Sequence, residues 1–179
     1  MRDLKEVEFR AFQEKIQKYI PSLTVLTDRE DGKYCFKYHR ERVYYAKQSL
    51  SRIAATIEKK KLLSFGTCLG KFSKKGVFKL HITALDFLSP YAKYRIWTKP
   101  SAEQQFLYGQ HVIKSGLARI TDDAPQYTGA IIMNMADLPI GFGATAKSAI
   151  QAKNTDPMTI VAFHQADLGE YIRNEDNLV

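Results

Sequence analysis

The run from Gly141 to Ser148 is the strongest candidate for a site that could do chemistry. It matches the phosphate-loop pattern G-x-x-x-x-G-K-[ST], except that Ala146 stands where the second glycine is required. That glycine lets consecutive backbone N–H groups wrap a phosphate without an intervening Cβ atom. A second partial match, Gly66 to Lys71, is one residue short and precedes Phe72 instead of a hydroxyl residue. We therefore interpret both runs as strand segments whose glycines let the backbone bend or another chain approach closely.

The histidines and cysteines encode no local metal or redox site. The histidines lack H-x-x-x-H and H-E-x-x-H spacing, and the two cysteines, Cys35 and Cys68, lack C-x-x-C pairing. His81 with Asp86 and a distant serine is conceivable as a triad, but triads are defined by geometry, and a surface or half-buried strand histidine is the simpler interpretation. We expect no cofactor and no metal. Without an apolar signal core at the N-terminus, a reducing, intracellular location is also expected.

Lysines and arginines offer a different chemistry, the binding of phosphate groups. Hairpin lysines lie near Phe72, Tyr44 and Tyr45, and nucleic-acid surfaces often combine phosphate contacts with base stacking. The competing interpretation is that tyrosines on amphipathic strands belong to the core. The candidate contacts are Lys59, Lys60 and Lys61 at a helix end, Lys71, Lys74, Lys75 and Lys79 around a hairpin, and Lys114, Arg119, Lys147 and Lys153 in the C-terminal half.

The positive charge is distributed unevenly along the chain. The net charge is +8, yet residues 1–93 carry 20 basic against 10 acidic residues, whereas residues 94–179 carry 7 against 9. Cations near phosphates release counterions, so the basic half indicates a polyanionic partner. The other interpretation is that a lysine-rich surface serves solubility. The C-terminal half, with a net charge of −2, is expected to bind RNA weakly by itself.

The N-terminal half shows both helical and strand patterns. Apolar residues recur at three- and four-residue intervals from Val7 to Ile20, which predicts a helix that Pro21 ends. A second helical pattern runs from Leu50 to Ile57 and ends at lysines, which suit the negative end of the helix dipole. β-rich runs between turn residues predict an antiparallel sheet with strands at residues 23–27, 34–38, 43–46, 62–72 and 77–85.

Ser89-Pro90 and the change in charge balance place a domain boundary near residues 89–94. Beyond it we expect a strand at 93–98 and a short helix after Pro100, capped reciprocally by Ser101 and Gln104. Strands at 129–133, 139–144 and 158–163 suit a small, partly closed β-barrel, with a short helix or tail at the end. The apolar stretch at 129–146 is interrupted by polar residues and a proline, so we expect no membrane span.

Two segments of the C-terminal half resemble a PUA domain, the RNA-binding module of pseudouridine synthases and archaeosine transglycosylases. His111 to Ile120 is similar to the early PUA segment with its fixed glycine, here Gly116. Ala136 to Ala144, which contains Leu-Pro-Ile-Gly-Phe-Gly, resembles the later PUA strand. The resemblance implies a PUA-type small β-barrel after a mixed N-terminal domain, that is, an α+β protein.

Across its whole length the chain resembles the Nip-seven family of eukaryotic large-ribosomal-subunit biogenesis factors. Residues 23–60 match this family less tightly than the rest, and the region after the glycine-rich strand is less basic than in archaeal relatives. The segments that carry the resemblance are Gly66 to Phe72, Phe78 to Leu85, Asp86 to Tyr94, Ile96 to Pro100, Glu103 to Gly109, Lys114 to Gly116 and Phe163 to Arg173.

The resemblance implies a non-catalytic protein of the nucleolus and nucleus that joins precursor large ribosomal subunits and supports pre-rRNA processing. It implies an N-terminal partner-docking domain at 1–92, a PUA domain at 93–170 and a short tail at 171–179. Its expected partners are pre-rRNA and assembly factors, including a Nop-eight-type RNA-recognition-motif protein, and the chain itself is expected to be monomeric. RNA contacts are expected at Lys114, Gly116, Arg119, Lys147 and Lys153, and RNA or partner contacts at the N-terminal lysines.

Two other hypotheses remain open at this point. The near-neutral C-terminal half favours an adaptor that protein partners hold in the pre-ribosome with little direct RNA contact. An RNA-modifying or nucleotide-hydrolysing enzyme is the third hypothesis, but residues 1–92 are too few for a pseudouridine synthase core and contain no catalytic aspartate motif.

Overall fold

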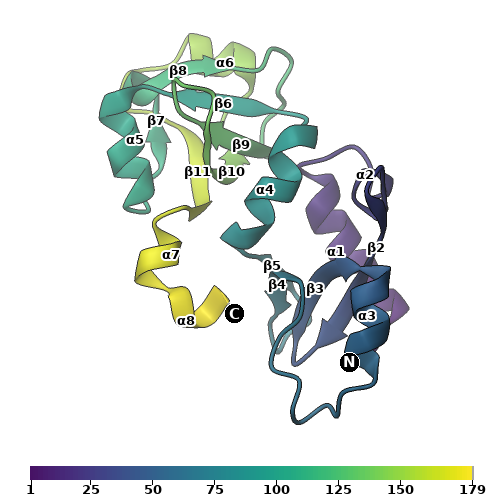
Figure 1. The fold of residues 1–179 in the computed structure, drawn as a ribbon. Helices are drawn as coiled ribbons and strands as arrows, with labels where there is room; N and C mark the ends of the chain where they lie inside the picture. The colour runs from purple at the N-terminus through teal and green to yellow at the C-terminus, as the bar shows by residue number, and fades with distance from the viewer. Residues whose placement is uncertain (179) are drawn as a thin grey trace.

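The structure, a computed structural model, describes residues 1–178 and contains two sheets, one in each half of the chain (Figure 1). The N-terminal sheet has five strands and the C-terminal sheet has six. Helices cover the N-terminal sheet, and the C-terminal sheet curls into a barrel-like body (Figure 1). The expected α+β class, with an antiparallel sheet followed by a small β-barrel, is confirmed.

The N-terminal sheet is an antiparallel meander in the order β1-β2-β3-β4-β5. Helix α1 packs on one face, where Phe12 contacts Phe36 and Phe78 at ring-centroid distances of 4.8 and 5.2 Å. The other face is covered by α3 and the following loop, where Tyr44 stacks on Phe65 at 4.9 Å. The elements are α1 (Glu6–Gln17), α2 (Thr24–Thr27), β1 (Asp28–Arg29), β2 (Gly32–His39), β3 (Arg42–Lys47), α3 (Gln48–Ala55), β4 (Thr67–Phe72) and β5 (Phe78–Leu80).

Three of the predicted N-terminal strands are wrong in part or in whole. The strand expected at 62–72 begins only at Thr67, because the residues before it form the loop that covers the sheet through Leu62 and Phe65. Residues 24–27 form the short helix α2, because Leu23 and Leu26 are buried together at helical spacing and this packing outweighs their β-propensity. The strand expected at 77–85 stops after Leu80. Ile82 and Leu85, three residues apart, are both buried in the helical link η1 (Ile82–Ala84), α4 (Leu85–Leu88) and η2 (Ser89–Tyr91).

The C-terminal sheet has the order β7-β11-β10-β9-β6-β8, in which only the β6–β9 pair is parallel among the described pairings. Its elements are β6 (Arg95–Thr98), α5 (Pro100–Leu107), β7 (Val112–Ile113), η3 (Lys114–Gly116), β8 (Leu117–Ile120), β9 (Gly129–Met133), β10 (Pro139–Thr145), α6 (Ala149–Lys153), β11 (Ile160–Asp167), α7 (Glu170–Arg173) and α8 (Glu175–Leu178). The first five residues of the run that resembles a phosphate loop, Gly141 to Thr145, therefore lie in strand β10, which pairs with β9 and β11 instead of wrapping an anion.

The helix expected after Pro100 is present, but its predicted capping box is wrong. Helix α5 begins at Pro100 itself with Lys99 as N-cap and no side-chain cap, because the fixed φ of proline favours the first helical position. A reciprocal capping box occurs instead at α6. There Ser148 Oγ accepts from Gln151 N at 3.3 Å, and Gln151 Oε1 accepts from Ser148 N at 3.1 Å.

One hydrophobic core runs across the junction between the two halves. It joins α1 and the first sheet to Ile131, Met133 and Phe142 of the second sheet. At the junction Tyr19 packs edge-on against Phe142, with the ring centroids 5.4 Å apart, and its hydroxyl donates to Gln165. Of the two alternatives for the chain end, a short helix or a tail, the structure shows the helices α7 and α8, and Leu178 packs into this shared core.

Candidate RNA interface

The expected PUA cations lie on separate elements of the barrel. Lys147 precedes α6 and Lys153 ends it, so the two lysines flank one short helix. Lys153 also forms an ion pair with Asp122, with its Nζ 3.2 Å from the carboxylate. Lys114 lies in η3, and Arg119 lies in β8. Since an acidic side chain already partly neutralises Lys153, this end of the barrel offers little unopposed positive charge.

Gly116 has a packing role in the structure. A Cβ atom at this position would collide with the Cβ atom of Ala102 in α5, so the glycine lets η3 approach that helix. The fixed glycine of the PUA-like segment is thereby explained by packing between η3 and α5.

Arg119 belongs to a stack on the outer face of the barrel sheet. Strand register places it directly across from Trp97 of β6, and its guanidinium lies 3.6 Å from the indole ring centroid. The edge of the indole is held by Asp137, whose Oδ1 accepts from Trp97 Nε1 at 2.6 Å. Sequence reasoning found Arg119 but missed Trp97 and Asp137. Their spacing carries no signal, because Arg119 is brought to Trp97 by the pairing of β6 with β8, and Asp137 by the pairing of β6 with β9.

A ladder of cations crosses the N-terminal sheet. Arg42 on β3 pairs in register with Lys71 on β4, which pairs in turn with Lys79 on β5. Lys71 and Lys79 are exposed, and Lys71 has a long ion pair of 3.8 Å with Glu41. Arg42 was missed by the sequence analysis, because its place beside the hairpin lysines depends on strand register. Like charges held directly opposite one another are unfavourable in isolation, so the exposed pair Lys71 and Lys79 is suited to contact with a polyanion.

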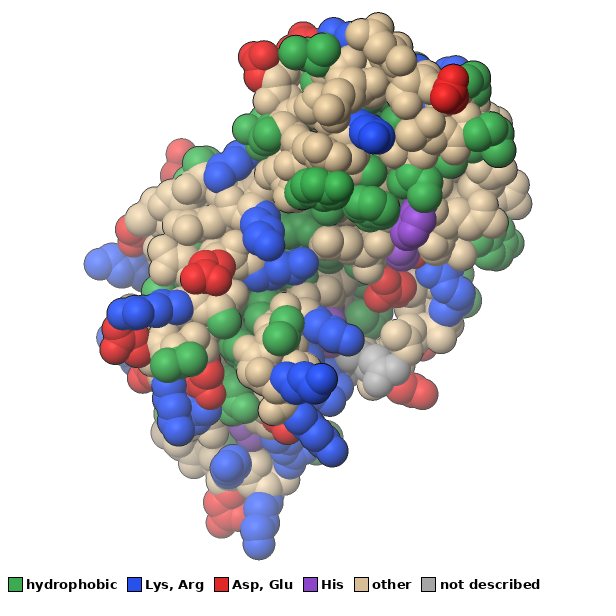
Figure 2. Space-filling model, turned by 180° about the vertical axis from the view of Figure 1, so that it is seen from behind, with side chains coloured by type: hydrophobic (Ala, Val, Ile, Leu, Met, Phe, Trp, Pro, Cys, Tyr) green, Lys and Arg blue, Asp and Glu red, His purple; other side chains and the backbone are tan. Residues whose placement is uncertain are grey.

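The remaining N-terminal lysines extend this basic surface. Lys74 and Lys75 sit in the exposed turn between β4 and β5, and Lys59 to Lys61 lie in the exposed segment after α3. Figure 2 displays one face of the molecule, on which Lys and Arg side chains crowd the lower, N-terminal half and are sparse above it. The excess of positive charge in the N-terminal half of the sequence thus lies on the exposed surface of that half.

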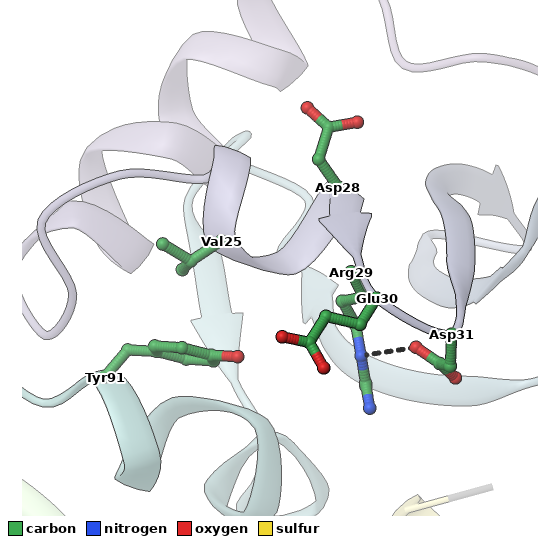
Figure 3. Close-up of a pocket in the computed structure, with 6 residues that line it drawn as sticks. All are labelled: Val25, Asp28, Arg29, Glu30, Asp31 and Tyr91. Atoms are coloured by element: carbon green, nitrogen blue, oxygen red, sulfur yellow. Dashed lines mark ion pairs between the residues drawn. The ribbon is translucent and has the colours of Figure 1, made fainter.

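A hollow of about 550 Å³ beside α2 does not suit an anion. Figure 3 shows its lining, in which Asp28, Glu30 and Asp31 contribute carboxylates on one side and Val25 and Tyr91 contribute apolar surface on the other. The one cation that lines it, Arg29, forms an ion pair with Asp31 at 3.1 Å. The balance of charge is acidic, so phosphate groups are expected to avoid this hollow.

A thiol and an imidazole meet under the cation ladder. Cys68 Sγ lies 3.9 Å from His81 Nδ1. Burial raises the pKa of the Cys68 thiol, which disfavours the reactive thiolate. Burial, together with the nearby Arg42 and Lys71, lowers the pKa of His81 to about 4. The pair therefore has the character of a buried structural contact instead of an activated nucleophile.

His39 is the most buried histidine of the described chain. Its Nε2 donates to the carbonyl of Leu62 at 2.8 Å, whereas its Nδ1 is buried without a hydrogen-bond partner. Burial accordingly lowers the pKa of His39, since a second proton would place an unsolvated charge in the core.

Two further observations concern metal ions and membranes. Within residues 1–178, no cluster of three or more histidine, cysteine or acidic side chains is arranged to hold a metal ion. None of the helices in the described chain is long and apolar enough to cross a bilayer.

Comparisons with known proteins match the chain along nearly all of its length. Residues 1–82 match the family model described as NIP7/UPF0113, pre-PUA domain, and residues 94–176 match the model described as UPF0113 PUA domain. Proteins named "60S ribosome subunit biogenesis protein NIP7 homolog" from Rattus norvegicus, Xenopus laevis and Danio rerio are 57%, 56% and 51% identical to it. Each alignment covers 99% of both chains.

Solved structures show the same fold at much lower sequence identity. A PUA domain from Aeropyrum pernix K1, solved as a tartrate complex, is 11% identical, has a TM-score of 0.60 and covers 96% of this chain and 87% of its own. A conserved PUA domain protein from Thermoplasma acidophilum is 12% identical and has a TM-score of 0.58. The match covers 96% of this chain and 95% of that protein. Together with the relatives above, the matched domain models establish that this chain belongs to the NIP7/UPF0113 family, with a pre-PUA domain followed by a PUA domain.

Proposed function

We propose that this chain is a non-catalytic RNA-binding assembly factor of the large ribosomal subunit. In this role it joins pre-ribosomes in the nucleolus and nucleus as a monomer and supports pre-rRNA processing. The observation that carries the proposal is identity of 51–57% over 99% of the chain to relatives named as 60S ribosome subunit biogenesis proteins. The proposed division of labour assigns residues 1–92 to partner docking and phosphate contact, and residues 93–170 to placement of the RNA.

The charge distribution supports a particular mode of RNA contact. The ladder of Arg42, Lys71 and Lys79 presents cations at the spacing of neighbouring strands, and each phosphate contact it makes would release counterions. The barrel half, with 7 basic and 9 acidic residues, contributes shape and stacking surface more than charge. We therefore assign most of the RNA affinity to the N-terminal sheet, and we assign the orientation of the bound RNA to the PUA barrel.

Crosslinking to pre-rRNA in purified pre-ribosomes tests the proposal. We expect Lys71→Gln with Lys79→Gln to reduce crosslinking and to lower the slope of log affinity against log salt by about 1.4, because each neutralised phosphate of a single strand contributes roughly 0.7 to that slope. A second variant neutralises Lys114, Arg119, Lys147 and Lys153, and it is expected to shift the crosslinked position with a smaller change in slope although it removes more cations. Crosslinking that survives both sets of changes would remove RNA contact from the proposal.

A second function, that of a protein adaptor, is favoured by an exposed apolar stripe along α3 and the residues just after it. The sequence places Leu50, Ile53 and Ile57 at helical spacing, yet in the structure these side chains are 42%, 63% and 44% exposed. The helix is instead anchored through Ser51 and Ala54, which are both buried. Such an apolar stripe on a surface helix marks a site for a protein partner.

We propose that the occupant of this stripe is an acidic amphipathic helix of another assembly factor, such as a Nop-eight-type RNA-recognition-motif protein. The stripe is bordered by Arg52 and by the lysines of residues 59–61, so acidic side chains on the partner would meet complementary charge. Ile53→Glu, at an exposed position, is expected to weaken binding of the purified partner at least tenfold and to leave RNA binding intact. Unchanged partner affinity would exclude α3 as the docking surface.

A further inference from the structure

Trp97 separates two hollows on the outer face of the barrel sheet. The larger hollow has a volume of about 360 Å³ and the smaller about 200 Å³, and both are lined by Trp97 and Asp137. Arg119 lines only the smaller hollow, while Arg95, Met133 and Pro139 line only the larger one. Since β6 lies between β8 and β9 in the sheet, Trp97 has Arg119 as its register partner on β8 and Met133 as its register partner on β9.

The larger hollow has the composition of a site for a flat ring. Its apolar lining comes from Trp97, Met133 and Pro139, together with Pro90 of η2. A volume of about 360 Å³ lies at the lower end of the range for small-ligand pockets, about 300 to 1,000 Å³. It is therefore large enough for one base.

Polar groups at the rim are fixed in place before any ligand binds. Asp137 has a left-handed backbone, with φ of 58°, and the hairpin before it is held by Asn134 Oδ1, which accepts from the backbone N of Ala136 and of Leu138 at 2.9 and 3.0 Å. One oxygen of Asp137 accepts from Trp97, which leaves its Oδ2 to accept from a ligand. Arg95 donates to the carbonyls of Ser89 and Pro90 at 3.1 and 3.3 Å, which ties the rim to the N-terminal half.

We propose that the larger hollow beside Trp97 captures one unpaired base of single-stranded RNA. The base stacks on the indole face opposite Arg119 and presents an exocyclic amino group to Asp137. RNA-binding proteins commonly stack splayed bases on aromatic rings and arginine planes. Arg95 and Arg119 flank the site with positive charge, which favours a ligand with a phosphate backbone over an uncharged peptide. This inference rests on the proposed RNA-binding function.

The single tryptophan of the chain supplies a direct test. Short adenosine and uridine oligoribonucleotides are titrated into the full-length protein at low salt, with excitation chosen to spare the tyrosines. A stacked base is expected to quench the emission of Trp97, more strongly for adenosine than for uridine, because uracil has no exocyclic amino group. In parallel, the anisotropy of an end-labelled oligomer reports binding anywhere on the chain.

The outcomes separate this inference from the function on which it rests. If anisotropy rises while Trp97 emission stays constant, the RNA binds elsewhere and the base site is overturned. If neither signal changes, the RNA-binding function itself fails. Equal quenching by both oligomers would overturn the role of Asp137 as the acceptor for the amino group.

Variants provide the second measurement. Trp97→Leu keeps an apolar side chain and removes the stacking face, and it is expected to weaken adenosine binding by about tenfold. Trp97→Phe retains a ring and is expected to recover most of the affinity. Leu138→Ser is the control, because Leu138 is an exposed residue of the same hairpin and lines neither hollow. In this variant the oligomer should quench Trp97 emission as it does in the wild type. If Trp97→Leu and Trp97→Phe bind the adenosine oligomer with equal affinity, stacking of the base on the ring at position 97 is contradicted.

Discussion

Replacing Asp167 with alanine is expected to destabilise the barrel and release the C-terminal helices. The carboxylate is fully buried and accepts four hydrogen bonds. Both of its oxygens accept from Arg173 Nη2, at 3.0 and 2.8 Å. His164 Nε2 donates to it at 2.6 Å and Gly169 N at 2.7 Å. Arg173 also donates to the carbonyl of Leu107 at 2.5 Å, so this network ties α7 to both β11 and α5.

The expected loss in the free energy of unfolding depends on which hydrogen-bond donors of Asp167 water can solvate after the substitution. Breaking a buried ion pair by removing one partner costs about 3–5 kcal/mol, because the other group is left without a partner. Here the side chain of Arg173 is 42% exposed and can be solvated by water, whereas that of His164 is only 14% exposed. We therefore expect the lower end of that range, about 3 kcal/mol, for Asp167→Ala.

Urea unfolding followed by circular dichroism measures this loss, and limited proteolysis tests whether α7 and α8 are released first. Glu6→Gln is the matched control, since it removes an exposed ion pair with Arg10 and is expected to have no measurable effect. A loss below about 1 kcal/mol for Asp167→Ala would refute the reasoning, because it would place the buried network in the same energy range as a surface ion pair.

Three further predictions concern the junction, the N-terminal core and α5. Gly129→Ala would place a Cβ atom 2.8 Å from Tyr19 Cε1, so a loss of about 1–3 kcal/mol in the free energy of unfolding is expected from urea titration. Because burial lowers the pKa of His81 to about 4, the unfolded chain binds a proton between about pH 6.5 and 4 that the folded chain excludes. The free energy of unfolding should therefore decrease as the pH is lowered through this window, by about 1–2 kcal/mol from pH 7 to pH 5 after solvent screening. His81→Gln should flatten that part of the plot of stability against pH. Gly116→Ala, which meets Ala102, should lower the melting temperature, whereas Gly76→Ala, where the added Cβ has open space, should show only the smaller cost of its left-handed backbone.

Much of the architecture could be predicted from residue patterns. The first helix, the hairpin strands at 34–38 and 43–46, and the barrel strands at 129–133 and 139–144 follow from local periodicity and turn residues. The errors fall where packing decides between competing local preferences. Residues 24–27 have β-rich composition, yet burial of Leu23 and Leu26 on one side makes them helical.

The candidate site was less accessible from the sequence than the fold was. The hairpin lysines could be found because they are close in the sequence, but Arg42 joins them only through strand pairing. Likewise, Trp97, Arg119 and Asp137 are far apart in the chain. They meet because β6 pairs with β8 and with the β9–β10 hairpin. Which distant strands pair is decided by tertiary packing, and a shift of one residue in their register would turn every side chain to the opposite face.

By itself, the sequence determined the α+β class, the concentration of positive charge in the N-terminal half and the PUA-like strand from Leu138 to Gly143. These properties depend on composition and on patterns within a few residues. Only the tertiary structure decided that the core is continuous across the junction, that the apolar face of α3 is exposed, and that Trp97 stands between two hollows. Each of these depends on which distant surfaces meet, and that is fixed by the packing of the two halves against each other.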